Sequence, residues 1–295
     1  MANPRQIVKR RKAVGNIHKI TKTMQLIATA RFQQAFQRAT ATKPYTQKIT
    51  HLVEQLSDAA EGQIDHKLLH ENPDAPRDVL LVLSSNRGFC GGYNAGILRT
   101  AMAHLKVHPE REQVLHVVGK KGISYFKFFG RPIEKAITEI DEKPRYEQVE
   151  PLATAFIEQY EKGLIGAVSV VYMKFISTGR QAPEVLRLLP LTRSEEDTGR
   201  RSTRPASHAA VQYEFSPPPE ELLKLLLPQT VKVRLFQCFT DMAVSEQVAR
   251  MVAMKAATDA GADMIKLLSR QYNRARQSQI TMELLDIVGG AEALK

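Results

Sequence analysis

The chain has 295 residues, of which 42 are Lys or Arg and 31 are Asp or Glu, so its formal net charge is +11. No uncharged stretch approaches the roughly 18 apolar residues that a membrane-spanning helix needs, so we expect no transmembrane segment. The two cysteines, Cys90 and Cys238, are typical of a protein that depends on no disulfide framework.

The basic charge is concentrated at the N-terminus. The first fifty residues contain eleven Lys or Arg and no Asp or Glu, so the remaining residues balance at 31 basic and 31 acidic. Such an arm favours a polyanionic partner, which would be nucleic acid, an anionic membrane surface or an acidic protein. A mitochondrial presequence is also basic, but these residues contain no serine, and a helical pattern continues through them. We therefore expect the arm to belong to the folded protein.

Residues 1–60 are predicted to form one long helix. After Pro4 the next proline is Pro44, and Gly15 is the one glycine between them. Ile17, Ile20, Met24 and Ile27 recur at 3-4-3 spacing, which is typical of a coiled-coil seam. Three alanines extend the seam and would allow a close approach of a second helix: Ala28, Ala35 and Ala39.

Residues 218–295 are predicted to form a second long helix. The prolines at 217–219 separate it from the preceding segment, and we expect Pro228 to break or kink its start. A helix of about 60 residues would be about 90 Å long and would need a partner to cover its apolar face. The predicted seam residues are Leu235, Cys238, Met242, Ala249, Val252, Ala256, Ala260, Met264 and Leu267. We expect an antiparallel coiled coil between the two ends of the chain.

Residues 76–217 are predicted to form a compact, Rossmann-like α/β domain, because strand-like and helix-like segments alternate there. The expected strands are 78–84, 113–118, 166–177, 185–191 and 211–215. The expected helices include Ile97, Met102 and Leu105, then Tyr125 and Phe129, then residues 150–162. The fold class is therefore α/β, with a long antiparallel coiled coil of the terminal helices beside a compact central domain.

No constellation of residues predicts an active site. The turns at 88–92 and 119–122 fit neither GxGxxG nor GxxxxGK[ST], so tight strand-to-helix turns are the expected reading. Cys90 has no neighbouring base, and the pairs His66/His70 and His104/His108 have no evident third metal ligand. We expect no catalytic residue, no cofactor and no metal, although a nucleotide-dependent enzyme built on the α/β domain stays a possible alternative.

Several sequence blocks resemble the gamma subunits of the F-type rotary ATP synthase, and the resemblance runs essentially end to end. The N-terminal block is IHKITKTMQLIATAR at residues 17–31, and the central ones are SSNRGFCGGYN at 84–94, VVGKKG at 117–122 and VYMKFISTGRQAPEVLRLLPL at 171–191. The C-terminal ones are SEQVARMVAMKAAT at 245–258 and NRARQSQITMELLDIVGGA at 273–291. Two positions depart from the family pattern: Asn86 replaces the usual Asp, and Phe89 replaces the usual Leu.

The resemblance implies a non-catalytic central-stalk rotor. Its paired terminal helices would turn inside a ring of alpha and beta subunits, and its α/β domain would contact the epsilon subunit and the c-subunit ring of the membrane sector. It would couple transmembrane ion flow to ATP synthesis and hydrolysis. Plastid members of the family carry a cysteine-bearing insertion after the strand that ends at Leu191, and residues 192–210 here contain no cysteine. Since we also expect no presequence, we expect a bacterial protein that is peripheral on the cytoplasmic side of the cell membrane.

The resemblance also implies subunit contacts at the C-terminal tip and at Met24, which would lie close to the C-terminal helix. The contact residues at the tip would be the polar Arg276, Gln277, Thr281 and Glu283 and the apolar Ile280, Leu284, Ile287 and Val288. The alternative function is a basic coiled-coil nucleic-acid-binding protein. The arm offers few aromatic residues for that role, and we expect no nucleic-acid partner.

Overall fold

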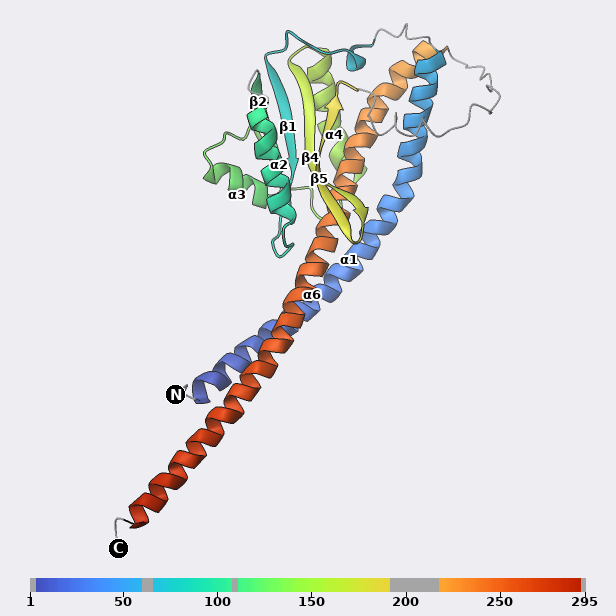
Figure 1. Cartoon of the computed structure of the whole chain (residues 1–295). Helices are drawn as coiled ribbons and strands as arrows, with labels where there is room; N and C mark the ends of the chain where they lie inside the picture. The colour runs from blue at the N-terminus through green and yellow to red at the C-terminus, as the bar shows by residue number, and fades with distance from the viewer. Residues whose placement is uncertain (1–3, 60–65, 108–110, 192–217, 293–295) are drawn as a thin grey trace. The chain divides into compact units, whose positions relative to one another are not determined.

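The computed structural model describes residues 4–59, 66–107, 111–191 and 218–292 (Figure 1). Its two longest helices are α1 (Pro4–Ala59), with 56 residues, and α6 (Pro219–Glu292), with 74. The chain divides into two compact units, and both helices contribute to each of them. The helical unit contains residues 1–30 and 250–295, and the central unit contains residues 31–249.

A five-stranded sheet organises the central unit. Its strands are β1 (Arg77–Leu83), β2 (Glu112–Val118), β3 (Lys135–Ile137), β4 (Ile165–Ser177) and β5 (Arg180–Leu189), in the order β3-β2-β1-β4-β5. The pairs β1–β2, β2–β3 and β1–β4 are parallel, whereas β4 and β5 form an antiparallel hairpin. The connecting helices are η1 (Lys67–Leu69), α2 (Tyr93–Val107), α3 (Lys120–Phe128) and α4 (Tyr146–Glu161).

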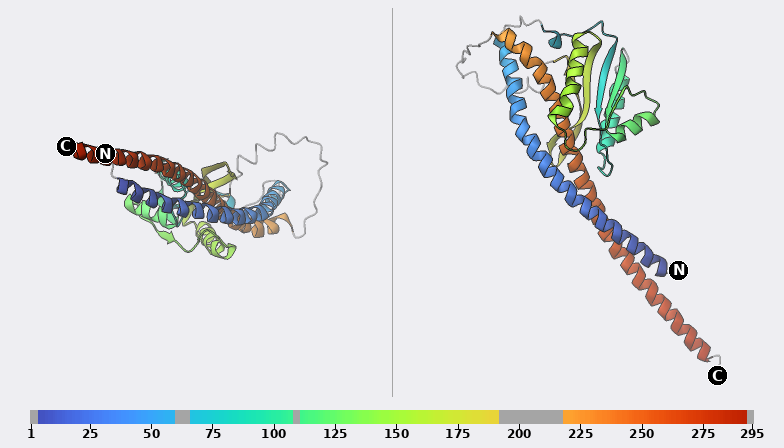
Figure 2. Two further views of the ribbon diagram at one scale, coloured as in Figure 1. Left: turned by 90° about the horizontal axis from the view of Figure 1, so that it is seen from below. Right: turned by 180° about the vertical axis from the view of Figure 1, so that it is seen from behind.

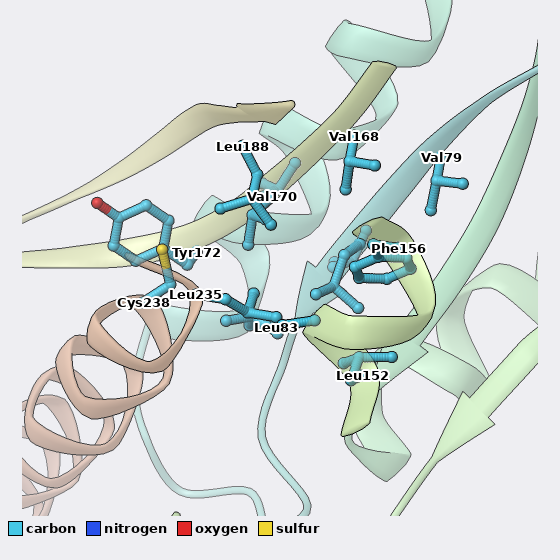
Figure 3. Close-up of a cluster of buried hydrophobic side chains, with 14 of the residues drawn as sticks. Val79, Leu83, Leu152, Phe156, Val168, Val170, Tyr172, Leu188, Leu235 and Cys238 are labelled. Carbon is cyan, nitrogen blue, oxygen red and sulfur yellow. The ribbon is translucent and has the colours of Figure 1, made fainter. Parts of the chain in front are cut away.

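Helices cover both faces of this sheet, as the alternation of side chains along β4 requires. Val168, Val170 and Tyr172 lie on the face where α4 contributes Phe156 and α6 contributes Leu235 and Cys238 to the buried cluster (Figure 3). On the other face, Gly96 of α2 packs so closely that a Cβ atom there would lie 3.3 Å from Cε of Met173. The first part of α6 is therefore part of the central core. This explains why its residues 235–242 read as a coiled-coil seam.

Within the central unit, α1 is attached to the sheet domain by an aromatic cluster and by ion pairs. The ring centroid of Phe175, near the tip of the β4–β5 hairpin, lies 6.4 Å from that of Phe32 and 5.8 Å from that of Phe36. The Glu142 carboxylate pairs with the Arg31 guanidinium on α1 and lies 3.9 Å from the Arg87 guanidinium in the turn after β1. Aromatic contacts of this kind contribute about 0.5–1.5 kcal/mol each beyond the burial of their area.

The α/β fold and the long terminal helices confirm the prediction from sequence. The strands predicted at 78–84, 113–118 and 166–177 match β1, β2 and β4 to within a residue or two. The strand predicted at 185–191 begins earlier, at Arg180, because hairpin pairing with β4 extends it. The short strand β3 was not predicted, and residues 211–215 lie outside the described part of the chain.

The predicted break at Pro228 is wrong. Helix α6 begins at Pro219 and continues through Pro228, and Leu227 and Val231 on either side are fully buried in the central core. Packing of these neighbours compensates for the hydrogen bond that a proline removes from a helix. Among the described helices, none is both long enough and apolar enough to cross a membrane.

His116 makes the stability of the central unit depend on pH. It is buried on β2 against Phe156, with ring centroids 5.5 Å apart, and its Nε2 atom lies 3.5 Å from the Glu134 carboxylate. Burial lowers the pKa of His116 below 6.5, and the Glu134 carboxylate offsets this only in part. The folded protein therefore keeps the ring neutral at a pH where the unfolded chain already binds a proton.

We therefore expect the free energy of unfolding to decrease as the pH falls from about 6.5 toward the lowered pKa of the folded state. His116→Met should weaken this dependence, whereas His70→Gln, at an exposed position, should preserve it. Urea unfolding of the full chain at several pH values measures the effect. An unchanged pH dependence in the Met variant would show that other groups cause it.

Candidate functional surfaces

The turn after β1 holds the start of α3 in place. The backbone N–H of Lys120 donates to Oδ1 of Asn86 (3.1 Å), that of Lys121 to the carbonyl oxygen of Ser85 (3.1 Å), and that of Gly122 to Oγ of Ser84 (2.9 Å). Ser84, Ser85 and Asn86 thus accept hydrogen bonds from backbone N–H groups that have no partner within their own helix at its N-terminus. These are the groups that bind phosphate in many nucleotide sites. Here the protein itself occupies them.

The glycines of this region are required for close packing. Gly119 has a φ of +92°, and a Cβ atom there would lie 2.1 Å from the carbonyl oxygen of Ser84. A Cβ atom on Gly122 would lie 2.5 Å from Oγ of Ser84. The segment after β2 therefore reads as a tight turn packed against Ser84, which agrees with the structural interpretation of the two glycine-rich turns.

The candidate ligands from the sequence have structural roles or lie outside the described residues. His66 accepts a hydrogen bond from the backbone N–H of Leu68 and so caps η1. Cys90 is buried and accepts a hydrogen bond from Nδ2 of Asn94 (3.2 Å). His104 lies in the last turn of α2, while His108 is outside the described part of the chain. Within the described residues, no group of three or more His, Cys, Asp and Glu side chains could hold a metal ion.

In the helical unit, α1 and α6 lie side by side and antiparallel (Figures 1 and 2). Nδ1 of His18 lies 3.0 Å from the carbonyl oxygen of Thr258, and the hydroxyl groups of Thr21 and Thr258 share a hydrogen bond of 3.0 Å. Further along, the guanidinium of Arg11 lies 5.5 Å from the ring centroid of Tyr272. The position on α1 falls from 21 to 11 while the position on α6 rises from 258 to 272, as two antiparallel helices require.

The seam predicted from apolar spacing is wrong for most of its residues in the helical unit, although Ala28 is buried and Met24 is half-buried. Ile17, Ile20 and Ile27 are about half exposed, at 56%, 58% and 47%. The seam of α1 is shifted by one residue, to His18, Thr21, Gln25 and Ala28, which are buried or half-buried. Likewise, several predicted seam residues of α6 are exposed: Val252, Ala256, Ala260, Met264 and Leu267. The buried or half-buried residues there include Met254, Thr258, Gly261, Ile265 and Leu268.

Small and polar residues decide this shift. A Cβ atom on Gly261 would lie 3.4 Å from Cβ of His18, so the backbone of α6 passes close to the histidine at this point. Thr21 and Thr258 are each only 8% exposed. Apolar spacing cannot detect a seam of this kind. The signal that could have indicated it is the glycine at 261, which is otherwise unfavourable inside a helix.

The last part of α6 extends past the start of α1, as the red end of α6 in Figure 1 shows. Every described residue from Gln279 to Ala291 is exposed. Ile280, Leu284, Ile287 and Val288 are 44%, 58%, 68% and 58% exposed and follow the i, i+4, i+7, i+8 spacing of one helical face. Arg276, Gln277, Thr281 and Glu283 are exposed around them, whereas Met24 on α1 is half-buried.

A second exposed surface lies at the end of α3 in the central unit. Phe128 is 85% exposed and Phe129 is 52% exposed, and their ring centroids lie 5.4 Å apart. Exposed basic residues surround this aromatic pair along the segment: Lys120, Lys121, Lys127, Arg131 and Lys135. Exposed aromatic residues beside basic ones are common where a protein contacts a partner.

Comparison with known proteins assigns the whole chain to one group. A family model described as ATP synthase matches residues 3–294. A protein of Rhodopirellula baltica named ATP synthase gamma chain is 46% identical over 299 residues, and the alignment covers 100% of both chains. A protein of Leptospira biflexa with the same name is 39% identical over 297 residues, again with 100% of both chains covered.

Solved structures show the same fold. A chain of the Euglena gracilis mitochondrial ATP synthase, solved as an assembly with OSCP, F1 and c-ring, superimposes with a TM-score of 0.65. It is 18% identical, and the match covers 99% of this chain and 94% of that one. A rotor chain of the same complex in another rotational state gives a TM-score of 0.62 at 17% identity, with 94% and 98% covered.

Asn86→Asp tests the anchoring of the turn after β1. The Asn86 amide donates to the carbonyl oxygens of Thr138 (3.2 Å) and Ile140 (3.4 Å), and its Nδ2 atom lies 3.5 Å from the Asp141 carboxylate. An aspartate would keep the bond from Lys120 but would place a negative charge against three acceptors. We expect it to destabilise the protein by about 1–3 kcal/mol near neutral pH, and less at a pH where the new carboxyl is protonated.

Thermal unfolding of the full chain at pH 7 and pH 4 measures this difference. Asn86→Ser is a useful comparison, because it removes the side-chain amide without adding charge. Equal stability of the Asp variant and the parent at pH 7 would contradict the role assigned to the Asn86 amide.

Proposed function

This chain belongs to the ATP synthase family, among its gamma chains, and on that basis we propose that it is the central-stalk rotor subunit of an ATP synthase. The observation that carries the proposal is end-to-end similarity to proteins named ATP synthase gamma chain, at 46% identity over the full length. It couples ion flow to ATP synthesis and hydrolysis. Neither the family model nor the relatives cited above support the nucleic-acid alternative.

The rotor has no catalytic role of its own. Its catalytic partners are the alpha and beta subunits, which surround the paired helices, and residues of this chain bind no nucleotide. The structural support is the occupied N-terminus of α3, where Asn86, Ser85 and Ser84 take the amides of Lys120, Lys121 and Gly122. A phosphate group would have to displace all three contacts.

Mechanical coupling requires that the helices and the sheet domain move together. In the central unit, the Phe32–Phe36–Phe175 cluster and the Arg31–Glu142–Arg87 ion pairs attach α1 to the sheet domain. Helix α6 contributes Leu235, Cys238 and Phe239 to the core of the same unit. A force applied to either helix is therefore transmitted to the sheet through packed side chains.

The energy of coupling has to come from many contacts. Shifting a catalytic subunit from a 1:99 to a 99:1 ratio between two states requires a differential contact free energy of about 5.5 kcal/mol. One exposed ion pair contributes about 0–1 kcal/mol. The proposed rotor surface is accordingly distributed. It combines exposed basic residues of the arm, such as Lys9, Lys19 and Lys22, with steric contact along the helix pair.

The exposed tip of α6 forms the bearing end of the rotor. Ile280, Leu284, Ile287 and Val288 would contact an apolar collar of the surrounding ring. Arg276, Gln277, Thr281 and Glu283 would form its polar contacts, and Met24 would act near α6. A helix that exposes such an apolar face is stable in water only with a covering partner.

The remaining partners are the epsilon subunit and the c-subunit ring, which contact the central unit. The Phe128–Phe129 pair and its basic neighbours are the surface that best suits an acidic partner there. The protein is part of a membrane-bound complex. We place it as a peripheral subunit on the cytoplasmic side of the cell membrane.

Truncation before Ile280 tests the tip. The shortened chain keeps the whole helix pair and should still assemble with alpha and beta subunits. ATP synthesis by the reconstituted complex should fall, because the bearing contacts are lost. Unchanged synthesis would remove the proposed role of the tip.

A finer version replaces Ile280, Leu284, Ile287 and Val288 by serine. The matched control replaces Gln279 and Asp286 by serine as well. At about 100° per residue, these two side chains lie on the opposite side of the same helical segment. We expect the apolar set to lower synthesis and the control to leave it close to the parent value. Equal effects of both sets would show that the apolar face has no special role.

A further inference from the structure

The helix pair of the helical unit contains a second possible seam that the structure does not use. On α1 the residues Ile17, Ile20, Met24 and Ile27 precede the observed seam residues by one position each. On α6 the exposed Met264 and Leu267 precede the half-buried Ile265 and the buried Leu268 in the same way. One residue corresponds to a rotation of about 100° about the helix axis. On α1 the unused seam is also the more apolar of the two, since it offers Ile17, Ile20, Met24 and Ile27 where the observed one has His18, Thr21, Gln25 and Ala28.

On α1, burial of apolar surface would favour the unused seam, but Ile17, Ile20 and Ile27 are already about half-buried, and rotation of α6 would expose Ile265 and Leu268. The net preference is therefore only a fraction of the roughly 1.5–3 kcal/mol that full burial of each large side chain provides. The observed seam must therefore be stabilised by an interaction that would be absent if the helices packed through the unused seam. Among the described residues of the helical unit, the layer of His18, Thr21 and Thr258 is an interaction of this kind.

This layer consists of hydrogen bonds that cross from one helix to the other. The carbonyl oxygen of Thr258 can only accept, so Nδ1 of His18 carries the hydrogen of their 3.0 Å contact. The Thr21 hydroxyl donates within its own helix to His18 O at 3.1 Å and accepts across the pair from the Thr258 hydroxyl at 3.0 Å. The single hydrogen of Thr258 is shared between Thr21 Oγ1 and Met254 O, which lies 2.7 Å away within α6. Gly261 lies directly against the His18 side chain. Rotation of either helix by one position would separate these groups.

We propose that the His18–Thr21–Thr258 layer is a clasp that selects the rotational setting of the two helices and keeps the row Ile17, Ile20 and Ile27 facing outward. A polar layer inside a helix pair costs stability but fixes register, which is its best-documented use. The outward row is then available to the subunits around the rotor. This role rests on the proposed function. It adds that coupling depends on which face of the helix pair is turned toward the surrounding subunits, as well as on the presence of the helix pair.

The test replaces the clasp with apolar residues of similar size, His18→Leu, Thr21→Val and Thr258→Val. The matched control is Thr23→Val, because Thr23 is exposed and its hydroxyl bonds only within its own helix, to Lys19 O at 3.0 Å. Loss of a cross-helix hydrogen bond should shift the equilibrium between the observed seam and the unused seam by about fivefold per bond, toward the unused seam. We expect the triple variant to unfold at the same temperature as the parent or higher, since its seam is more apolar.

Two cysteine reporters measure the setting in the full chain. Ala28→Cys occupies a position that is 1% exposed in the parent, and Ile20→Cys one that is 58% exposed. A maleimide should label position 20 quickly and position 28 slowly in the parent and in Thr23→Val. In the triple variant, position 28 should gain reactivity and position 20 should lose it.

The second measurement is the ratio of ion transport to ATP hydrolysis in the reconstituted complex. We expect this ratio to fall in the triple variant and to stay at the parent value in Thr23→Val. Parent-like labelling or a parent-like ratio in the triple variant would overturn the clasp. If the parent chain itself fails to restore coupled transport, the proposed function is wrong, while the labelling pattern still decides whether the clasp sets the rotation.

Discussion

The close contact of two helices from opposite ends of the chain is the constraint on which the rest of the structure depends. Neither segment could be a stable single helix of this length in water without a partner. In the helical unit the contact is made by small and hydrogen-bonded residues, with Thr21 against Thr258 and His18 against Gly261. In the central unit α6 is instead covered by the sheet and α4, and α1 is attached through Phe175. One helix therefore uses two different kinds of packing along its length.

These two kinds of packing suit two different tasks. The central unit buries large apolar side chains, such as Phe156 and Phe239, and so resists deformation. The helical unit buries little that is large and leaves Ile17, Ile20 and Ile27 at its surface. A part that must contact other subunits has to expose such residues, because contact energy of several kcal/mol cannot come from exposed ion pairs alone.

Sequence patterns predicted the architecture well and the helix–helix contact poorly. The buried strands β1, β2 and β4 are continuous apolar runs, which have few alternative interpretations. Pro228 was expected to interrupt α6, but burial of Leu227 and Val231 outweighs the lost hydrogen bond. The seam was missed because apolar periodicity ranks isoleucine above histidine and threonine, whereas geometry places His18 and Thr21 inside. The capping of α3 by Ser84, Ser85 and Asn86 depends on contacts between distant segments, and no local pattern reveals it.

The amides at the start of α3 are hydrogen-bonded within the protein, at the place where a related sheet could hold a ligand. Open sheets of this topology commonly hold nucleotides where their parallel strands end. A phosphate group bound at this corner would have to displace the contacts that Ser84, Ser85 and Asn86 make with the amides of Lys120, Lys121 and Gly122. The chain therefore uses, to hold α3 against the sheet, the same amides that nucleotide-binding sheets of this topology offer to a ligand.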